Sequence, residues 1–67
     1  MATSQEIGSI AGKVWSTLDS NGEMSITAIK KEVGGPATLV DWAIGWLARE
    51  GKLAFRQEKN GLKISLR

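Results

Sequence analysis

The chain has 67 residues, with 9 Lys and Arg, 7 Asp and Glu, and neither His nor Cys. A chain of this length forms a single domain, expected to span residues 1–67, and buries only roughly 60% of its unfolded surface. The absence of His and Cys excludes zinc fingers, iron–sulfur sites, thiol nucleophiles and imidazole bases.

The sequence also indicates what the protein does not do. No apolar run approaches the roughly 20 residues of a membrane span, and the first residues lack the pattern of a signal peptide. We therefore expect a cytoplasmic protein without membrane contact. Serine has no histidine partner, and the glycine pairs lack the Gly-Lys-Ser/Thr of a phosphate-binding loop. We expect no enzymatic activity, cofactor, metal or small-molecule ligand.

The first predicted element is an amphipathic helix that begins at the capping box Thr3-Ser4-Gln5-Glu6. Asn21-Gly22 predicts its end, because glycine readily adopts the left-handed conformation that follows a helix. The apolar stripe of this helix has helical spacing and consists of Ile7, Ile10, Ala11, Val14 and Leu18. A short extended segment, Glu23-Met24-Ser25, follows it.

Two further helices are predicted on either side of a sharp break. Ser25 is suited to the N-cap of a second helix that runs to about Val33. Gly34-Gly35-Pro36 interrupts the chain, and a third helix runs from about Ala37 to Glu50. The third helix directs four residues to the core, namely Val40, Ala43, Ile44 and Leu47.

After Gly51 the apolar spacing changes from 3.6 to 2 residues, as in β-strands. Asn60-Gly61 predicts a two-residue type I′ turn between two strands. The resulting register sets Lys59 opposite Leu62, Glu58 opposite Lys63, Gln57 opposite Ile64 and Phe55 opposite Leu66. It places Phe55, Ile64 and Leu66 on one face of the hairpin.

The order of elements predicts an α+β fold of the winged helix-turn-helix type. It has three helices plus a C-terminal β-hairpin wing, with a short strand between helices one and two. The second and third helices are the helix-turn-helix unit, and the hairpin that follows them is the wing.

Three blocks of sequence resemble a known family. They are Ala11-Gly12-Lys13-Val14-Trp15, Asn21-Gly22 with Met24-Ser25-Ile26, and Ala43-Ile44-Gly45-Trp46-Leu47-Ala48-Arg49-Glu50-Gly51-Lys52. Together the blocks are similar to the very small, stand-alone bacterial and archaeal winged-helix proteins of uncharacterised function. The resemblance implies a winged helix and a small homo-oligomer, and it implies no established activity.

The distribution of charge points to the hairpin as a nucleic-acid surface. Residues 52–67 carry a net charge of +4, whereas residues 1–35 and 36–51 each carry −1. Cations are needed to contact phosphates. The residues expected to contact double-stranded DNA are Thr38, Arg49, Arg56, Lys59, Lys63 and Arg67. The alternative for the hairpin is that its outward cations only confer solubility and prevent edge pairing. Asp41 on the third helix would repel phosphate.

The aromatic residues point to a second kind of surface. Trp42 and Trp46 are four residues apart and share a helix face with Leu39. We expect Trp46 to pack under the hairpin against Leu53 or Phe55. Trp15 is suited equally to a core and to an interface. The residues expected at a partner interface, in a homodimer, are Gly8, Gly12, Trp15, Leu39 and Trp42.

Gly8 and Gly12 allow two readings. Glycine within a helix costs about 1 kcal/mol relative to alanine. The pair either permits close packing within the monomer or forms a strip that another backbone approaches.

Two functions therefore remain, a DNA-binding protein that acts as a transcriptional regulator and a protein-interaction or dimerisation module that does not bind DNA.

Overall fold

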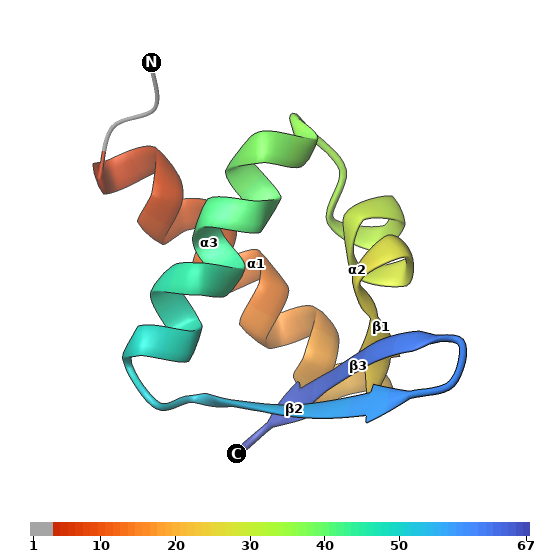
Figure 1. Ribbon diagram of the computed structural model, residues 1–67. Helices are drawn as coiled ribbons and strands as arrows, with labels where there is room; N and C mark the ends of the chain where they lie inside the picture. Colours follow the sequence, from red (N-terminus) through yellow and green to blue (C-terminus); the bar gives the residue numbers. More distant parts are fainter. Residues whose placement is uncertain (1–3) are drawn as a thin grey trace.

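The computed structural model of the protein describes residues 4–67 and contains three helices and a three-stranded antiparallel sheet (Figure 1). The elements in chain order are α1 (Ser4–Asn21), β1 (Met24–Ser25), α2 (Ile26–Val33), α3 (Ala37–Arg49), β2 (Leu53–Glu58) and β3 (Gly61–Leu66). This is the predicted winged helix-turn-helix fold, in which α2 and α3 are the helix-turn-helix and β2, β3 and their turn are the wing. Thr3 of the predicted capping box lies outside the described residues.

The helix ends follow the local signals in the sequence. Gly22 has a φ of 77° and donates its backbone N–H to the carbonyl of Leu18 over 2.8 Å, which closes α1. Gly34 also has a positive φ, of 74°, and its backbone N–H donates to the carbonyl of Lys30 over 2.9 Å, which closes α2. α3 ends at Arg49, one residue before the predicted end, and Glu50 is its C-cap.

Ser25 belongs to two elements at once. Its side-chain oxygen accepts a hydrogen bond from the backbone N–H of Ala28 over 3.1 Å, so it is the N-cap of α2. It is also the last residue of β1, where it pairs with Lys63 of β3. The start of α2 is therefore attached directly to the wing.

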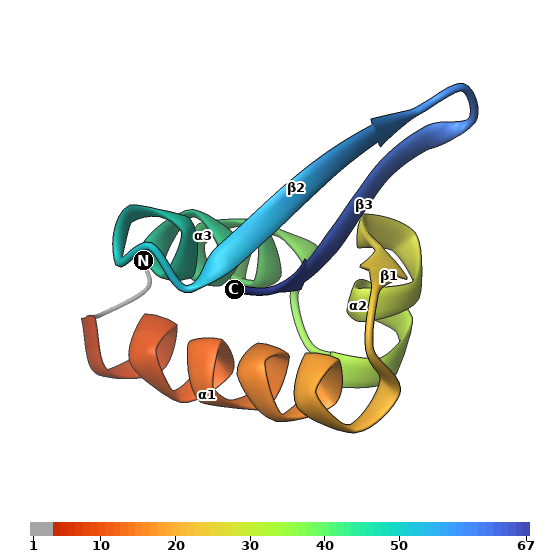
Figure 2. The ribbon, with the colours of Figure 1, turned by 90° about the horizontal axis from the view of Figure 1, so that it is seen from below.

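The sheet has the strand order β1-β3-β2, so β3 is central and the wing is joined to the helices by β1. Met24 of β1 pairs with Ile64 of β3. In Figure 2 the hairpin rises from the side of α1 past α2, and its tip projects beyond the helices.

The register of the hairpin differs from the predicted one. Glu58 pairs with Gly61, so the two loop residues are Lys59 and Asn60. Each β2 residue faces a partner two positions earlier than predicted, and Phe55 lies opposite Ile64 rather than Leu66. A type I′ turn needs positive φ at both loop residues. Among the described residues only glycines have positive φ, so Lys59 and Asn60 do not form this turn, and Gly61, with a φ of 141°, follows them. The shift is by two residues, so every side chain keeps its predicted face.

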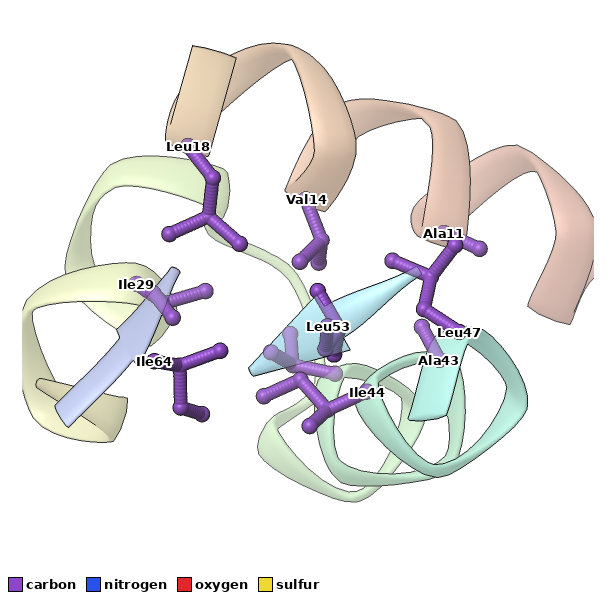
Figure 3. Close-up of a cluster of buried hydrophobic side chains, with 10 residues drawn as sticks. Ala11, Val14, Leu18, Ile29, Ala43, Ile44, Leu47, Leu53 and Ile64 are labelled. Atoms are coloured by element: carbon purple, nitrogen blue, oxygen red, sulfur yellow. The ribbon is translucent and has the colours of Figure 1, made fainter. Parts of the chain in front are cut away.

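The core lies between α1, α3 and the sheet (Figure 3). Its buried side chains are Ala11, Val14, Leu18, Ile29, Val40, Ala43, Ile44, Leu47, Leu53 and Ile64. All four α3 residues predicted to face the core are among them. On the same hairpin face, Ile64 of the central strand is fully buried, whereas Phe55 of β2, an edge strand, remains 46% exposed.

Candidate nucleic-acid interface and an aromatic groove

The outward side of α3 is a stripe of four exposed residues, Thr38, Trp42, Gly45 and Arg49, which we call the outer stripe. Helical spacing places these residues opposite the buried side of α3. Of the residues predicted to contact DNA, Thr38 and Arg49 lie at opposite ends of this stripe. Trp42 lies between them.

The negative charge beside the outer stripe is paired. Asp41 forms an ion pair with Lys30 of α2, with 2.9 Å between the carboxylate oxygen Oδ1 and the ammonium nitrogen Nζ. The expected repulsion between Asp41 and a phosphate is therefore reduced by the charge of Lys30 on the neighbouring helix. The pair also links the two helices of the helix-turn-helix.

Arg56 of the wing is engaged by two carboxylates. Its guanidinium donates to both carboxylate oxygens of Glu23, with Nε at 3.1 Å from Oε2 and Nη2 on Oε1. Its Nη1 also donates to Glu58 over 3.2 Å. A two-pronged pair of this kind fixes the guanidinium in one orientation. Arg56 therefore links the wing to the segment before β1, and its guanidinium is engaged by Glu23 and Glu58.

The ionisation of both partners reflects this geometry. The hydrogen bond from Arg56 holds the pKa of Glu23 below its ordinary value of 4.5, and the charges of Arg56 and Lys63 act in the same direction. The hydrogen bond to Glu23 raises the pKa of Arg56. Both shifts favour the charged pair at neutral pH.

The remaining wing cations are open within the part of the chain that the structure describes. All four remaining cations of residues 52–67 form no ion pair there, namely Lys59 and Lys63 in the wing and Lys52 and Arg67 at its base. Lys59 is at the tip, and Lys63 lies directly opposite Arg56 on the outer face of the sheet. Arg67 follows β3, and its backbone N–H donates to the carbonyl of Lys52 over 3.0 Å. Open positive charge thus extends along residues 52–67, while Lys13, Lys31 and Arg49 on the helices likewise form no ion pair among the described residues.

A shallow hollow lies between the wing tip and the start of α2. It has a volume of about 230 Å³ and is lined by Ser25, Glu58, Lys59, Asn60, Gly61, Leu62 and Lys63. The two lysines bring positive charge to a hollow beside the N-terminus of a helix. Helix N-termini carry partial positive charge of their own.

All three tryptophans are on the surface. Trp15, Trp42 and Trp46 are 42%, 46% and 41% exposed. The expectation that Trp46 is covered by the hairpin is therefore wrong. Leu39 is half-buried, one turn before the exposed tryptophans of α3.

Trp15 and Trp46 line the same depression, which we call the aromatic groove. Its lining residues are Gly8, Ala11, Gly12, Trp15, Trp46, Leu47 and Lys52, and its volume is about 300 Å³. The groove joins one flank of α1 to the C-terminal end of α3. It thus brings together three of the five residues predicted at a partner interface, Gly8, Gly12 and Trp15. Trp42 and Leu39 are not part of its lining.

The two glycines of the groove have open space above them. A Cβ atom added to Gly8 or Gly12 meets no atom within 4 Å. The reading that these glycines permit close packing within the monomer is therefore wrong. Nothing in the described residues 4–67 requires glycine at either position.

The described residues hold no group of three or more Asp and Glu side chains arranged to bind a metal ion. None of the described helices has both the length and the apolar character needed to cross a membrane.

Two features of these surfaces had no signal in the sequence. Glu23 and Arg56 are far apart in the chain, and only the pairing of β1 with β3 brings them together. Trp46 and Lys52 join Trp15 in the groove because the end of α3 packs beside the first half of α1. Neither arrangement can be derived from helical or strand spacing.

Comparison with known proteins supports the fold. A family model described as winged helix-turn-helix domain (DUF2582) matches residues 1–66. The uncharacterized protein MJ1608 from Methanocaldococcus jannaschii is 37% identical over an alignment of 65 residues, and the alignment covers 92% of this chain and 91% of that protein.

Two solved structures are also similar. The solution NMR structure of protein BT2368 from Bacteroides thetaiotaomicron has a TM-score of 0.83 and 31% identity, covering 92% of this chain and 76% of that one. The crystal structure of the Zalpha domain from Carassius auratus PKZ in complex with Z-DNA has a TM-score of 0.80 and 21% identity, covering 91% and 97%. The second likeness is one of fold.

Proposed function

This chain belongs to the winged helix-turn-helix domain family DUF2582, and we propose that it binds double-stranded DNA through the outer stripe of α3 and the wing. The observation that carries the proposal is the row of open cations along the wing, Lys52, Lys59, Lys63 and Arg67. The Zalpha domain of the same fold is bound to Z-DNA, which supports DNA as the class of ligand. Control of transcription is the biological role proposed for this binding.

In this proposal, most of the affinity comes from phosphate contacts. Lys59 and Lys63 flank the hollow at the wing tip, and Arg49 extends the positive charge to the end of α3. Thr38 is the hydroxyl that the outer stripe offers at the start of α3. Because the outer stripe has few groups that recognise base edges, the binding depends more on charge than on sequence.

We propose that Arg56 also positions the wing. Its guanidinium donates hydrogen bonds to Glu23 and Glu58, so the phosphate contacts proposed for the wing fall mainly to the neighbouring cations. Replacement of Arg56 is therefore expected to act on the orientation of the wing as well as on charge.

The test is an NMR titration of the protein with a mixed-sequence duplex at about 50 and about 200 mM salt. We expect shifts in α3 and in residues 52–67, with an affinity that falls as salt rises. Arg49→Gln and Lys59→Gln should each weaken binding and reduce the slope of log K against log salt by about 0.9. Lys13→Gln on α1 is the matched control and should leave the slope unchanged.

A second duplex of alternating dG and dC, held in the left-handed form, tests whether the form of the DNA matters. Tighter binding to this duplex than to the mixed-sequence duplex would show that this chain prefers left-handed DNA, the ligand in the Zalpha structure. The absence of shifts with both duplexes at the lower salt concentration would refute the proposed function.

A second candidate function is a protein-interaction module that self-associates as a homodimer and does not bind DNA. Three exposed tryptophans in so short a chain favour it, because large apolar side chains on a surface mark interaction sites. Trp42→Ala discriminates between the candidates. It should alter association with a protein partner under this second function, whereas the wing variants should have no effect.

A further inference from the structure

We propose that a hollow at the end of α3 binds an unpaired guanine of a nucleic-acid strand, with the base stacked on Trp46. The hollow is lined by Trp46, Arg49 and Glu50 and has a volume of about 360 Å³, and we call it the Trp46 hollow. In this site Glu50 recognises the edge of the base, and Arg49 contacts its phosphate. Such a site goes beyond the proposed binding of duplex DNA, because its base is not paired.

The three side chains lie together because of helical spacing. Arg49 and Glu50 follow Trp46 by three and four residues, so all three share one face at the end of α3. The backbone N–H of Glu50 donates to the carbonyl of Trp46 over 3.1 Å, and Gly51, with a φ of 73°, turns the chain after it. The position of Glu50 is therefore fixed by the end of the helix. In Figures 1 and 2 this end of α3 lies at the opposite end of the molecule from the wing tip.

Trp46 offers the aromatic surface on which a base can stack. It is 41% exposed, and it lines the aromatic groove as well as the Trp46 hollow, so it borders two separate depressions. Proteins that bind single strands stack unpaired bases on exposed aromatic side chains. The volume of the hollow lies within the range of about 300–1,000 Å³ that is typical of small-ligand sites, which leaves room for one base.

The carboxylate in the hollow distinguishes guanine from the other bases. A carboxylate has only acceptors, so Glu50 pairs with a base that presents donors. Guanine presents two adjacent donors, the N1–H and the N2 amino group, on the edge that base pairing normally occupies. The other bases present a single donor there, next to an acceptor. Glu50 is exposed and forms no ion pair within residues 4–67, so its carboxylate is open to such a ligand.

The cations beside Trp46 fit a strand better than a lone base. Arg49 is in the Trp46 hollow, and Lys52 lines the aromatic groove, the other depression that Trp46 borders. Neither cation forms an ion pair within the part of the chain that the structure describes. Two open cations near one stacked base can contact successive phosphates, and such contacts add affinity that does not depend on sequence.

An NMR titration with a strand of dT that contains one central dG tests the proposal, and an all-dT strand of the same length is the reference. We expect the indole N–H of Trp46 and the amides of Arg49 and Glu50 to shift. The dG strand should bind about tenfold more tightly than the all-dT strand, because only guanine satisfies Glu50 with two donors.

Replacement of the tryptophan tests the stacking. Trp46→Leu should weaken binding of the dG strand by about tenfold or more. Trp42→Leu replaces the other exposed tryptophan of α3, which does not line the hollow, and is the matched control. It should leave the affinity for the dG strand unchanged. Circular dichroism confirms that both variants remain folded.

Free nucleotides test the charged groups one at a time. Guanosine monophosphate should bind more tightly than inosine monophosphate, which lacks the N2 amino donor. Glu50→Gln should remove most of this difference, whereas Glu32→Gln, an exposed change on α2, should retain it. Arg49→Gln should weaken guanosine monophosphate more than guanosine, because only the nucleotide carries a phosphate.

The possible outcomes separate the parts of the proposal. Tighter binding of the dG strand than of guanosine monophosphate supports a strand as the ligand, and the reverse order would assign the site to a free nucleotide instead. Equal binding of the two strands would overturn the recognition of guanine. No shift at Trp46 with the dG strand or with guanosine monophosphate at about 5 mM would overturn the site. None of these ligands is a duplex, so this site and the proposed duplex binding can each fail without the other.

Discussion

Glycine occurs in this chain in two settings with opposite consequences for stability. Gly22 has a φ of 77°, a left-handed conformation that other residues adopt only with strain. Gly12 lies within α1, and a side chain added to it would meet open space. In the first setting glycine stabilises the fold, and in the second it only weakens the helix.

We predict that Gly12→Ala stabilises the monomer by about 1 kcal/mol, because alanine has the higher helix propensity and causes no clash. Urea unfolding at a protein concentration well below that of self-association measures the change. Gly22→Ala is the contrasting variant and should destabilise the chain, because alanine is strained at that φ. Destabilisation by Gly12→Ala would mean that the position is crowded.

For individual side chains, the sequence predicts burial better than exposure. The apolar residues of α3 at helical spacing are buried, as the pattern of Val40, Ala43, Ile44 and Leu47 predicts. The exposure of Trp46 could not be predicted, since it depends on where the hairpin crosses the end of α3. A hydrophobic residue outside the main stripe of a helix has no partner that helical spacing can identify.

The wing is an element whose attachment combines strand pairing with charge. β1 holds β3 through Met24 and Ser25, and Glu23 holds β2 through Arg56. Because the pKa of Glu23 is lowered in the folded chain, the pair stabilises the fold above the ordinary pKa of 4.5. This contribution is lost as the pH falls through the lower, folded value.

We predict that an NMR titration of the side-chain carboxyl of Glu23 gives a pKa below 4.5, and that Arg56→Gln returns it toward 4.5. Removal of the guanidinium removes the hydrogen bond that favours the carboxylate. Lys31→Gln changes an exposed residue of α2 and is the control. It should leave the pKa of Glu23 as it is in the wild type. An unchanged pKa in Arg56→Gln would show that the pair does not form in solution.

The hairpin shows what strand alternation can and cannot determine. Alternation assigned Ile64 to the buried face, which is confirmed, but it is equally consistent with Phe55 opposite Ile64 or opposite Leu66. The two registers differ by two residues and keep all side chains on the same faces. Only the turn distinguishes them. The preference of Asn-Gly for hairpin turns predicted the turn at Asn60-Gly61. In the structure Gly61 has a positive φ but is the first residue of β3, so the turn lies one residue earlier.

For the molecule as a whole, the small core sets a narrow margin of stability. The described residues include ten buried apolar side chains and no buried polar or charged ones. Cores of chains below roughly 70 residues rarely supply more than about 3–5 kcal/mol. A single cavity in such a core is therefore comparable with the total free energy of unfolding.

We predict that Ile64→Ala costs about 2–5 kcal/mol and leaves much of the protein unfolded at room temperature. Ile64 is fully buried and joins the sheet to the core, so its truncation leaves a cavity (Figure 3). Thermal unfolding followed by circular dichroism measures the effect. Ile64→Val, which removes one methyl group, should cost only about 0.5–1.5 kcal/mol. Equal stability of the two variants would contradict a closely packed core at this position.

The double role of Ser25 couples the wing to the start of the helix-turn-helix. Its backbone pairs with Lys63 in the wing, and its side chain caps the helix that precedes α3. A ligand that stabilises one position of the wing is therefore expected to stabilise one geometry at the start of α2 as well. Such a coupling free energy is reciprocal, so in the proposed DNA complex the contacts of the wing and of α3 are expected to reinforce each other.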